Sequence, residues 1–289
     1  MQKIILYYKF TPVKDPDMTM RWQRELCERL GLKGRILISP HGINGTLGGD
    51  IESLRIYKRA MNESIIFKDI TYKWSNGNID HFPKLKVKVK PEIVAFDAVD
   101  EIVVTEKGIV NGGKHLKPEA LHRLVAEKSG AGIEVIFYDG RNMYEAQIGR
   151  FKNTVIPKVV TAKEFKNDLE NGEISKFKDK PIVTYCTGGI RCEILSAMML
   201  NRGYSEVYQM DGGIAKYGEK FADDGLWEGK LFVFDDRMQM GFSDKSKDIA
   251  DCENCGKKTS NQINSTNIRR KLHVVCEECA SDRVASAKA

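Results

Sequence analysis

A cysteine followed by two glycines and an arginine is the stretch of this sequence best suited to chemistry. Cys186 comes directly after an apolar run at residues 181–185, and Gly188, Gly189 and Arg191 follow it. A helical pattern comes next, so the order is strand, glycine-containing loop, helix. Backbone N–H groups in such a loop and the dipole at the helix N-terminus favour negative charge. A thiol held there loses its proton readily, which makes Cys186 the candidate catalytic residue.

The loop is one residue shorter than the phosphate-binding loop of tyrosine phosphatases, because only four residues separate Cys186 from Arg191. A shorter loop suits a smaller group, such as a terminal sulfur atom on the cysteine. Arg191 can hold an anion or fix the loop, and Cys192 is either a second thiol or a core residue. The alternative for Cys186 is a buried structural cysteine. The predicted active-site loop comprises Thr187, Gly188, Gly189, Ile190 and Arg191.

Four further cysteines form two pairs near the C-terminus. Cys252 and Cys255, and then Cys276 and Cys279, are each separated by two residues, and 20 residues lie between the pairs. Two such pairs suit tetrahedral coordination of a structural zinc ion. Gly256 follows the first pair, as a tight turn requires. The alternative is a set of unpaired surface cysteines.

Lysines alternate with apolar residues over residues 84–90. In a strand this pattern places the lysines on one face and the apolar residues on the other. Such a face can contact RNA phosphates. Taken alone, it is more typical of a solvated face or of an edge strand protected against aggregation. A second basic cluster lies between the cysteine pairs. The candidate RNA-binding residues are Lys84, Lys86, Lys88, Lys90, Arg269, Arg270 and Lys271.

None of the sequence patterns that bind a redox cofactor is visible. The five histidines are widely scattered and form no two-histidine, one-carboxylate pattern. Gly48-Gly49-Asp50 is too short for a dinucleotide-binding loop. We therefore predict no catalytic iron, flavin or nicotinamide.

The first 90 residues alternate strand and helix patterns in the order of a ferredoxin-like α+β sandwich. A cap residue followed by proline, Asp15-Pro16, predicts a helix start, and a second helix is expected near residues 51–58. Residues 41–46 are expected to form a turn-rich connector. The expected strands are residues 4–10, 34–39, 65–74 and 85–89.

The central region has the alternation of a parallel α/β domain. Residues 134–138, 182–185 and 207–210 are expected strands, and Thr161 to Glu164 reads as a capping box opening a helix. The predicted domains are 1–95, ferredoxin-like; 96–225, a catalytic α/β domain; and 226–289, a cysteine-rich zinc-binding module.

Composition limits the class of protein. The chain has 289 residues, 42% of them hydrophobic, and a net charge of +6, which allows a polyanionic partner without demanding one. No run of 18 apolar residues occurs and the N-terminus has no leader pattern, so we predict a cytoplasmic protein without membrane contact. Its seven cysteines are then expected to be thiols or metal ligands.

Residues 133–217 resemble a rhodanese domain. The segments 139–145 and 149–151 are similar to the first signature of that family, and 203–208 with 212–214 to its last. Cys186 falls where the catalytic cysteine of the family falls. Asp139 and Arg141 in the first signature are expected to brace the domain.

The resemblance extends over nearly the whole chain. It includes residues 33–38, 42–46, 82–88, 113–116, 186–193 and 226–237. Together these blocks resemble the prokaryotic tRNA uridine hydroxylases, which form 5-hydroxyuridine at the wobble position of tRNA in an oxygen-dependent reaction. The resemblance implies tRNA, bound through its anticodon loop, as partner and O2 as co-substrate, with Cys186 as the essential thiolate. No obligate protein partner is predicted.

Two other classes of function compete with tRNA hydroxylation. A rhodanese-type sulfurtransferase would carry a persulfide on Cys186, and the loop alone supports it equally well. The N-terminal and C-terminal blocks have no purpose in a simple sulfur carrier. A non-enzymatic RNA-binding or zinc adaptor would leave the Cys186 loop unused.

Overall fold

The computed structural model describes residues 1–264 and 272–286. Contacts divide the chain into two compact units, each of which is described by itself. The first unit is Met1–Gly113 with Glu193–Asn201, and the second is Lys114–Cys192 with Arg202–Ala289. Among the described residues, no helix combines the length and the apolar character needed to cross a membrane.

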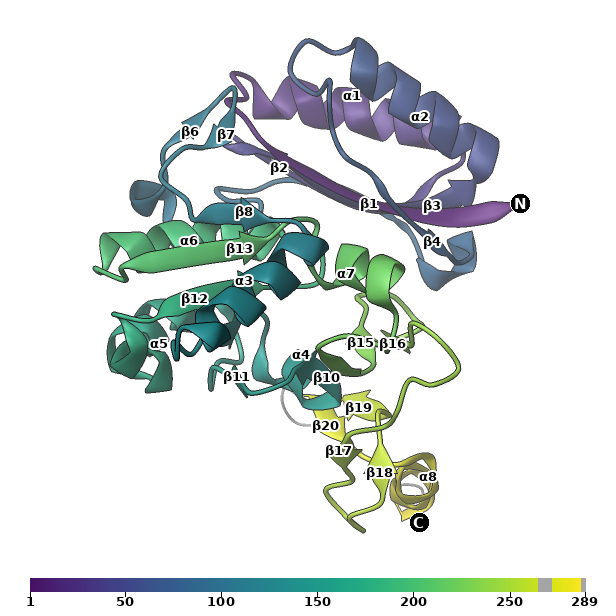
Figure 1. The fold of residues 1–289 in the computed structure, drawn as a ribbon. Coiled ribbons are helices and arrows are strands. Elements are labelled where there is room, and N and C mark those ends of the chain that lie inside the picture. Colours follow the sequence, from purple (N-terminus) through teal and green to yellow (C-terminus); the bar gives the residue numbers. More distant parts are fainter. Residues whose placement is uncertain (265–271, 287–289) are drawn as a thin grey trace. The chain divides into compact units, whose positions relative to one another are not determined.

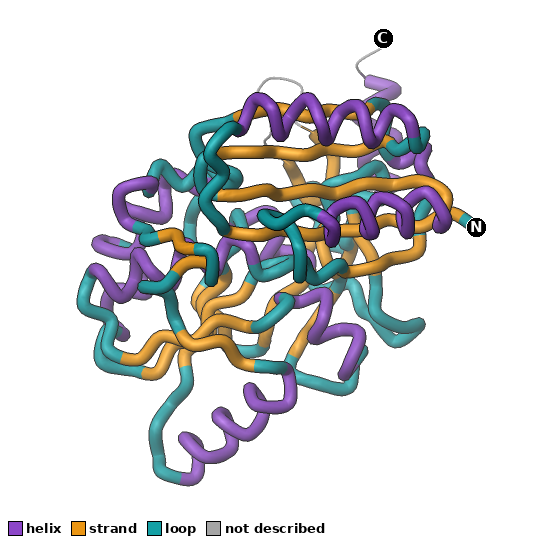
Figure 2. The backbone as a smooth tube through the Cα atoms, turned by 90° about the horizontal axis from the view of Figure 1, so that it is seen from above, coloured by secondary structure: helices purple, strands orange, loops and turns teal. Residues whose placement is uncertain are grey.

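The first unit is a five-stranded sheet in the order β4-β1-β3-β2-β5, with helices α1 and α2 on one face (Figures 1 and 2). This arrangement confirms the predicted ferredoxin-like sandwich. Its elements are β1 Gln2–Phe10, α1 Pro16–Arg29, β2 Lys33–Ser39, β3 Gly42–Asp50, α2 Ile51–Glu63, β4 Lys73–Asn76, β5 Leu85–Val89, β6 Val104–Thr105, β7 Gly108–Ile109 and the short 3-10 helices Ile79–His81 and Val99–Glu101.

Local sequence explains where the two helices of this unit begin. The Asp15 carboxylate accepts the N–H of Met18 at 2.8 Å, and Pro16 occupies the first helical position, as predicted. Asp50 caps α2 in the same way, by accepting the N–H of Glu52 at 3.0 Å. Both helices then bury apolar side chains, among them Leu26 and Leu54, against the sheet.

Two sequence predictions in this unit are wrong. Of residues 41–46, only His41 lies in a turn, and Gly42 to Thr46 belong to strand β3 rather than to a connector, because β3 pairs with both β1 and β2 and this pairing overrides local turn propensity. The expected strand at residues 65–74 is mostly turn, and β4 begins only at Lys73. A hydrogen bond from Lys68 N–H to the Ser64 carbonyl and the positive φ of 65° at Asp69 close that turn.

The second unit is built on a five-stranded sheet in the order β11-β9-β12-β13-β8, in which all neighbours are parallel (Figure 1). Its elements are β8 Lys114–Leu116, α3 Pro118–Gly130, β9 Ile136–Asp139, α4 Met143–Ile148, β10 Gly149–Phe151, β11 Thr154–Val155, α5 Phe165–Asn171, β12 Pro181–Tyr185, α6 Ile190–Asn201, β13 Glu206–Met210, α7 Gly213–Phe221 and the 3-10 helices Ala162–Glu164 and Glu173–Phe177. By its contacts, α6 belongs to the first unit from Glu193 onward.

The C-terminal part of the second unit consists of short strands and one helix. Strand β14 pairs with β10, and Trp227 of β14 packs edge to face on Phe151 at 5.5 Å between ring centroids. The elements are β14 Trp227–Gly229, β15 Leu231–Phe232, β16 Gln239–Met240, β17 Ala250–Asp251, β18 Lys258–Thr259, β19 Gln262–Asn264, β20 Leu272–Val274 and α8 Glu277–Ser286.

The capping box predicted at Thr161 is not formed. The Thr161 hydroxyl donates to Glu164 Oε1 at 2.9 Å, and Glu164 Oε2 accepts the N–H of Val160 at 2.9 Å. With the threonine oxygen engaged by a side chain, the segment starts as a 3-10 turn and α5 begins only at Phe165.

Candidate active site

Cys186 lies at the carboxyl edge of the parallel sheet. Strands β9 and β12 run side by side and end at Asp139 and Tyr185, which are paired in register. Cys186 is the next residue after β12. Open α/β sheets bind their ligands at this edge, so the sheet places the predicted nucleophile where a site is expected.

The loop places backbone donors around the sulfur. The N–H of Gly189 donates to Cys186 Sγ at 3.1 Å. Helix α6 begins at Ile190, so its positive end follows the loop directly. Gly189 has a φ of 98°, a conformation that favours glycine, whereas Gly188 is not among the glycines with positive φ.

The start of helix α7 also holds the loop in place. The Ile214 and Ala215 N–H groups at the start of α7 donate to the carbonyls of Cys186 and Thr187 at 2.9 and 3.0 Å. Gly213, with a φ of 67°, makes this approach possible, because a Cβ there would lie 2.3 Å from the Cys186 carbonyl oxygen. The loop backbone is therefore fixed by α7 as well as by α6.

Arg191 is held by a buried carboxylate. Its Nη1 and Nη2 atoms lie 2.6 and 2.8 Å from the two oxygens of Glu145, and Nη2 also donates to Thr187 Oγ1 at 3.3 Å. Burial alone would lower the pKa of Arg191, but the Glu145 charge outweighs it and raises that pKa. Of the two roles considered for Arg191, this geometry favours fixing the loop.

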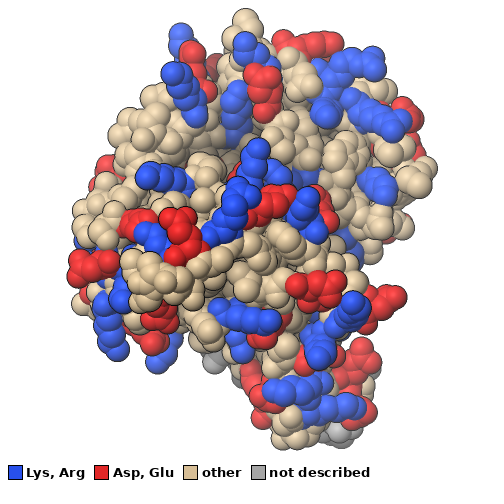
Figure 3. Space-filling model, viewed as in Figure 1, with Lys and Arg blue, Asp and Glu red and all other residues tan. Residues whose placement is uncertain are grey.

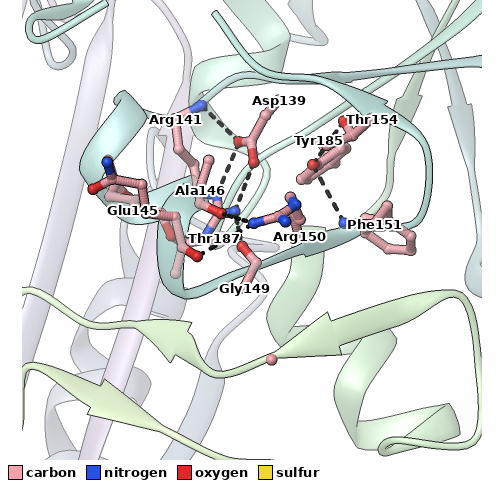
Figure 4. A network of polar contacts seen from close by, with 12 residues as sticks. Asp139, Arg141, Glu145, Ala146, Gly149, Arg150, Phe151, Thr154, Tyr185 and Thr187 are labelled. Atoms are coloured by element: carbon pink, nitrogen blue, oxygen red, sulfur yellow. Dashed lines mark hydrogen bonds and ion pairs between the residues drawn. The ribbon is translucent and has the colours of Figure 1, made fainter. Parts of the chain in front are cut away.

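Asp139 and Arg141 brace the domain, as the rhodanese resemblance implies (Figure 4). The Arg141 Nε and Nη2 atoms donate to the two Asp139 oxygens at 2.9 and 2.6 Å, and both side chains are fully buried. Nη2 also donates to the Gly149 carbonyl at 2.6 Å. The Tyr185 hydroxyl beside them donates to Thr154 Oγ1 at 2.9 Å. All these groups are paired within the protein, so they support the loop without offering a free group to a substrate.

Two cysteines share the interior of the loop. Burial by itself would raise the pKa of the Cys186 thiol, but the hydrogen bond from the Cys192 thiol, the Arg191 charge and the N–H groups of residues 191 and 192 together lower it to about 5. Burial and the adjacent Cys186 sulfur raise the pKa of Cys192. Cys186 is thus the thiolate of the pair, and Cys192 remains a protonated donor.

The four C-terminal cysteines come together as a cluster that could hold a metal ion. The sulfurs of Cys252, Cys255, Cys276 and Cys279 all lie within 4.8 Å of one another. Cys255 Sγ and Cys276 Sγ are 3.7 Å apart, close to the ~3.8 Å expected between thiolates on a tetrahedral zinc ion. Gly256 has a φ of 73°, in agreement with the predicted tight turn.

The lysine-rich segment has the predicted alternation. Strand β5 lies at the end of its sheet, with Val87 buried while Lys86 and Lys88 are exposed. Lys84 and Lys90, on either side of the strand, are exposed as well. Acidic and basic side chains are interspersed over the face of the molecule shown in Figure 3. The predicted basic cluster Arg269, Arg270 and Lys271 lies outside the described residues.

Comparison with known proteins assigns each region to a family. Residues 2–93 match the UPF0176 acylphosphatase like domain, residues 118–220 the rhodanese-like domain and residues 228–288 the rhodanase C-terminal region. A relative from Corynebacterium jeikeium, named tRNA uridine(34) hydroxylase, is 55% identical over 281 residues, which cover 97% of this chain and 90% of the relative. The chain belongs to the tRNA uridine(34) hydroxylase family.

Another tRNA uridine(34) hydroxylase, from an Arthrobacter species, is 54% identical over 97% of this chain and 95% of its own length. Solved structures are far less similar. A rhodanese-related protein from Thermoplasma volcanium is 16% identical, with a TM-score of 0.28 over 36% of this chain and 89% of its own. Thiosulfate sulfurtransferase from Pseudomonas aeruginosa is 19% identical, with a TM-score of 0.29 over 36% of this chain and 18% of its own. At these TM-scores, neither structure supports a conclusion about the function of this chain.

Sequence reasoning assigned no role to Glu145, the partner of Arg191. The residue closes the first rhodanese signature and is fully buried. The sequence did contain a signal for this pair: an acidic residue without a role in that signature and an arginine in the cysteine loop. Only the folded structure brings the two together, because they lie 46 positions apart in the sequence.

Proposed function

We propose that this chain hydroxylates C5 of the wobble uridine of tRNA, with Cys186 as the essential thiolate and O2 as co-substrate. Membership of the tRNA uridine(34) hydroxylase family supports the substrate and the reaction. The observation that carries the role of Cys186 is its environment at the carboxyl edge of the sheet. There the sulfur accepts a loop N–H at 3.1 Å and has its pKa lowered to about 5.

A thiolate solves the chemical difficulty of this reaction. C5 of uracil is a poor partner for oxygen until the 5,6 double bond is broken. Addition of the Cys186 thiolate at C6 would make C5 electron-rich, as an enolate conjugated to the C4 carbonyl. Addition of O2 at C5 would give a 5-hydroperoxide, and an external two-electron reductant such as a dithiol would cleave its O–O bond to leave the 5-hydroxyl group and water. Loss of the C5 proton with elimination of the Cys186 thiolate would then restore the 5,6 double bond. The loop N–H groups stabilise the sulfur anion before addition and after elimination.

The anticodon loop suits this chemistry because its bases are largely unpaired and can be turned into a pocket. We propose that the exposed lysines 84, 86, 88 and 90 contact tRNA phosphates. The basic residues 269–271 are proposed to do the same. A tRNA substrate also implies a cytoplasmic protein.

We further propose that Cys252, Cys255, Cys276 and Cys279 hold a structural zinc ion, supported by their mutual distances below 4.8 Å. Zinc would stabilise the fold of the module without taking part in the reaction. The proposed modules are residues 1–95, 96–225 and 226–289. The family matches at 2–93, 118–220 and 228–288 support these boundaries.

The deciding experiment is nucleoside mass spectrometry of tRNA incubated with the purified protein under isotope-labelled O2, with a dithiol added as the two-electron reductant. Wild type should introduce labelled oxygen into 5-hydroxyuridine, and Cys186→Ser should lose the activity by on the order of a thousandfold or more. Cys27→Ala, which removes a buried thiol in the other unit, is the matched control. Undiminished hydroxylation by Cys186→Ser would remove the role of this cysteine.

The second candidate is a rhodanese-type sulfurtransferase with a persulfide on Cys186. The complete burial of Cys186 favours it, because a terminal sulfur would extend the reactive atom beyond the enclosed Sγ. Thiocyanate formation from thiosulfate and cyanide tests this candidate. A protein that forms thiocyanate rapidly but leaves tRNA unmodified would establish it in place of the hydroxylase.

A further inference from the structure

Phe234 is the one phenylalanine, tyrosine or tryptophan among the described residues that is exposed to solvent, with 57% of its surface accessible. It follows β15 and lies within the block 226–237 that resembles the hydroxylase family. The proposed reaction gives this block no role. Single exposed apolar residues are common on protein surfaces. The position of this one is what sets it apart.

The ring lies against the active-site loop. The guanidinium carbon of Arg191 is 5.7 Å from the centroid of the Phe234 ring, a cation–π contact. The same guanidinium is fixed by Glu145 and reaches Thr187, the residue directly after Cys186, at 3.3 Å. An exposed, flat apolar surface therefore stands beside the loop that carries the thiolate.

Neighbouring residues also hold the Phe234 ring in place. Phe232, which is only 3% exposed, meets Phe234 edge to face with centroids 5.0 Å apart. The next turn is closed by Arg237, whose Nε and Nη2 donate to the Asp235 carboxylate at 2.7 and 2.6 Å. The Met238 N–H donates to the Asp235 carbonyl at 2.9 Å. An exposed ring on such a support is already ordered before a ligand arrives, which lowers the entropy lost on binding.

We propose that Phe234 is the stacking platform that holds the target pyrimidine of a single-stranded RNA loop against the Cys186 loop. This inference rests on the proposed function. A pyrimidine offers a flat π face, and stacking of an unpaired base on an aromatic side chain contributes about 1–3 kcal/mol. Glu145 neutralises the adjacent arginine, so the site offers a flat apolar face and suits an uncharged ring better than a phosphate.

Steady-state kinetics on tRNA give the first test. Phe234→Ala should lower kcat/KM about five- to 150-fold, the equivalent of that stacking energy, and Phe234→Tyr should restore most of the activity. The thermal midpoint and the thiolate absorbance of Cys186 should stay at wild-type values, which separates lost stacking from a damaged loop. Val160→Ala, another exposed apolar truncation in the same unit, is the matched control. An unchanged kcat/KM in Phe234→Ala would overturn the inference.

A photocrosslinking test does not depend on turnover. An anticodon stem-loop with 5-iodouridine at the wobble position is irradiated with the protein, and the crosslinked peptide is identified by mass spectrometry. Attachment at Phe234, lost in Phe234→Ala, supports the platform even if wild type shows no hydroxylation, so failure of the proposed function stays distinguishable. Attachment elsewhere, or none, overturns the platform whether or not hydroxylation occurs.

Discussion

The guanidinium of Arg191 is clamped by both carboxylate oxygens of Glu145, at 2.6 and 2.8 Å, and that carboxylate is fully buried. A cysteine loop that binds phosphate needs its arginine free to face the anion. Here the charge is already balanced inside the protein, so the loop is better suited to a neutral substrate group. Uracil is such a group, whereas a phosphomonoester is not.

Replacement of Glu145 by glutamine should destabilise the domain. The change leaves a buried arginine without its counter-charge, and breaking a buried pair in this way costs about 3–5 kcal/mol. Denaturant unfolding of Glu145→Gln should show this loss, while Glu228→Gln, an exposed acid of the same unit, should stay within about 0.5 kcal/mol of wild type. Equal stability of the two variants would contradict a structural role for the ion pair.

Removal of the Cys192 thiol should raise the pKa of Cys186. The hydrogen bond from Cys192 contributes to lowering that pKa to about 5, so Cys192→Ala should move the thiolate titration to higher pH. The thiolate is the reactive form, and it is lost as pH falls through this pKa. Each pH unit of displacement therefore lowers reactivity about tenfold below the midpoint.

The titration is best followed by the ultraviolet absorbance of the thiolate, as the difference between each protein and its Cys186→Ser derivative. Cys27→Ala serves as control. Burial raises the pKa of the Cys27 thiol to about 12, so this thiol does not titrate in the pH range in which Cys186 does. A titration of Cys186 that is the same with and without Cys192 would show that the second thiol is only a core residue.

The cysteine cluster should bind zinc in equimolar amount, measurable by elemental analysis of the purified protein. Cys276→Ser removes one of the four ligands and should release the metal. The segment from residue 252 onward should then become susceptible to proteolysis. Wild-type protein free of metal, or full zinc retention in Cys276→Ser, would refute the proposed site.

Neutralising the lysines along β5 should weaken tRNA binding in a salt-dependent way. Each lysine that contacts a phosphate contributes about one to the slope of log affinity against log salt. Changing Lys84, Lys86, Lys88 and Lys90 to glutamine should lower that slope, whereas the same change at the exposed Lys176 and Lys180 should not. If the slope of log affinity against log salt were the same in both variants, the β5 lysines would be solvated side chains of an edge strand and not phosphate contacts.

Residues whose local pattern agrees with the fold could be placed from the sequence. The Asp15-Pro16 helix start, the apolar strand before Cys186 and the alternating lysines all behave as their periodicity and capping chemistry indicate. The two cysteine pairs likewise meet as their spacing predicts. In the first three cases neighbours along the chain determine the outcome, and in the fourth the shared ligand chemistry of the cysteines does.

Features that depend on distant partners could not be placed in this way. Strand β3 has the glycine and asparagine of a turn, and it is extended only because β1 and β2 flank it. The bond between Glu145 and Arg191 and the contact of Arg191 with Phe234 join residues 46 and 43 positions apart. Neither contact has a local signature.

The enclosure of Cys186 also bears on how long such an enzyme can work. A low-pKa cysteine exposed to oxidants passes through sulfenic acid to sulfinic and sulfonic acids, the last of which cannot be repaired. Cys186 has none of its surface accessible, with the loop backbone and the first turn of α7 packed around it. Peroxide in bulk solvent therefore has poor access to the sulfur. In the proposed oxygen-dependent reaction, this shielding would slow the self-inactivation of the enzyme.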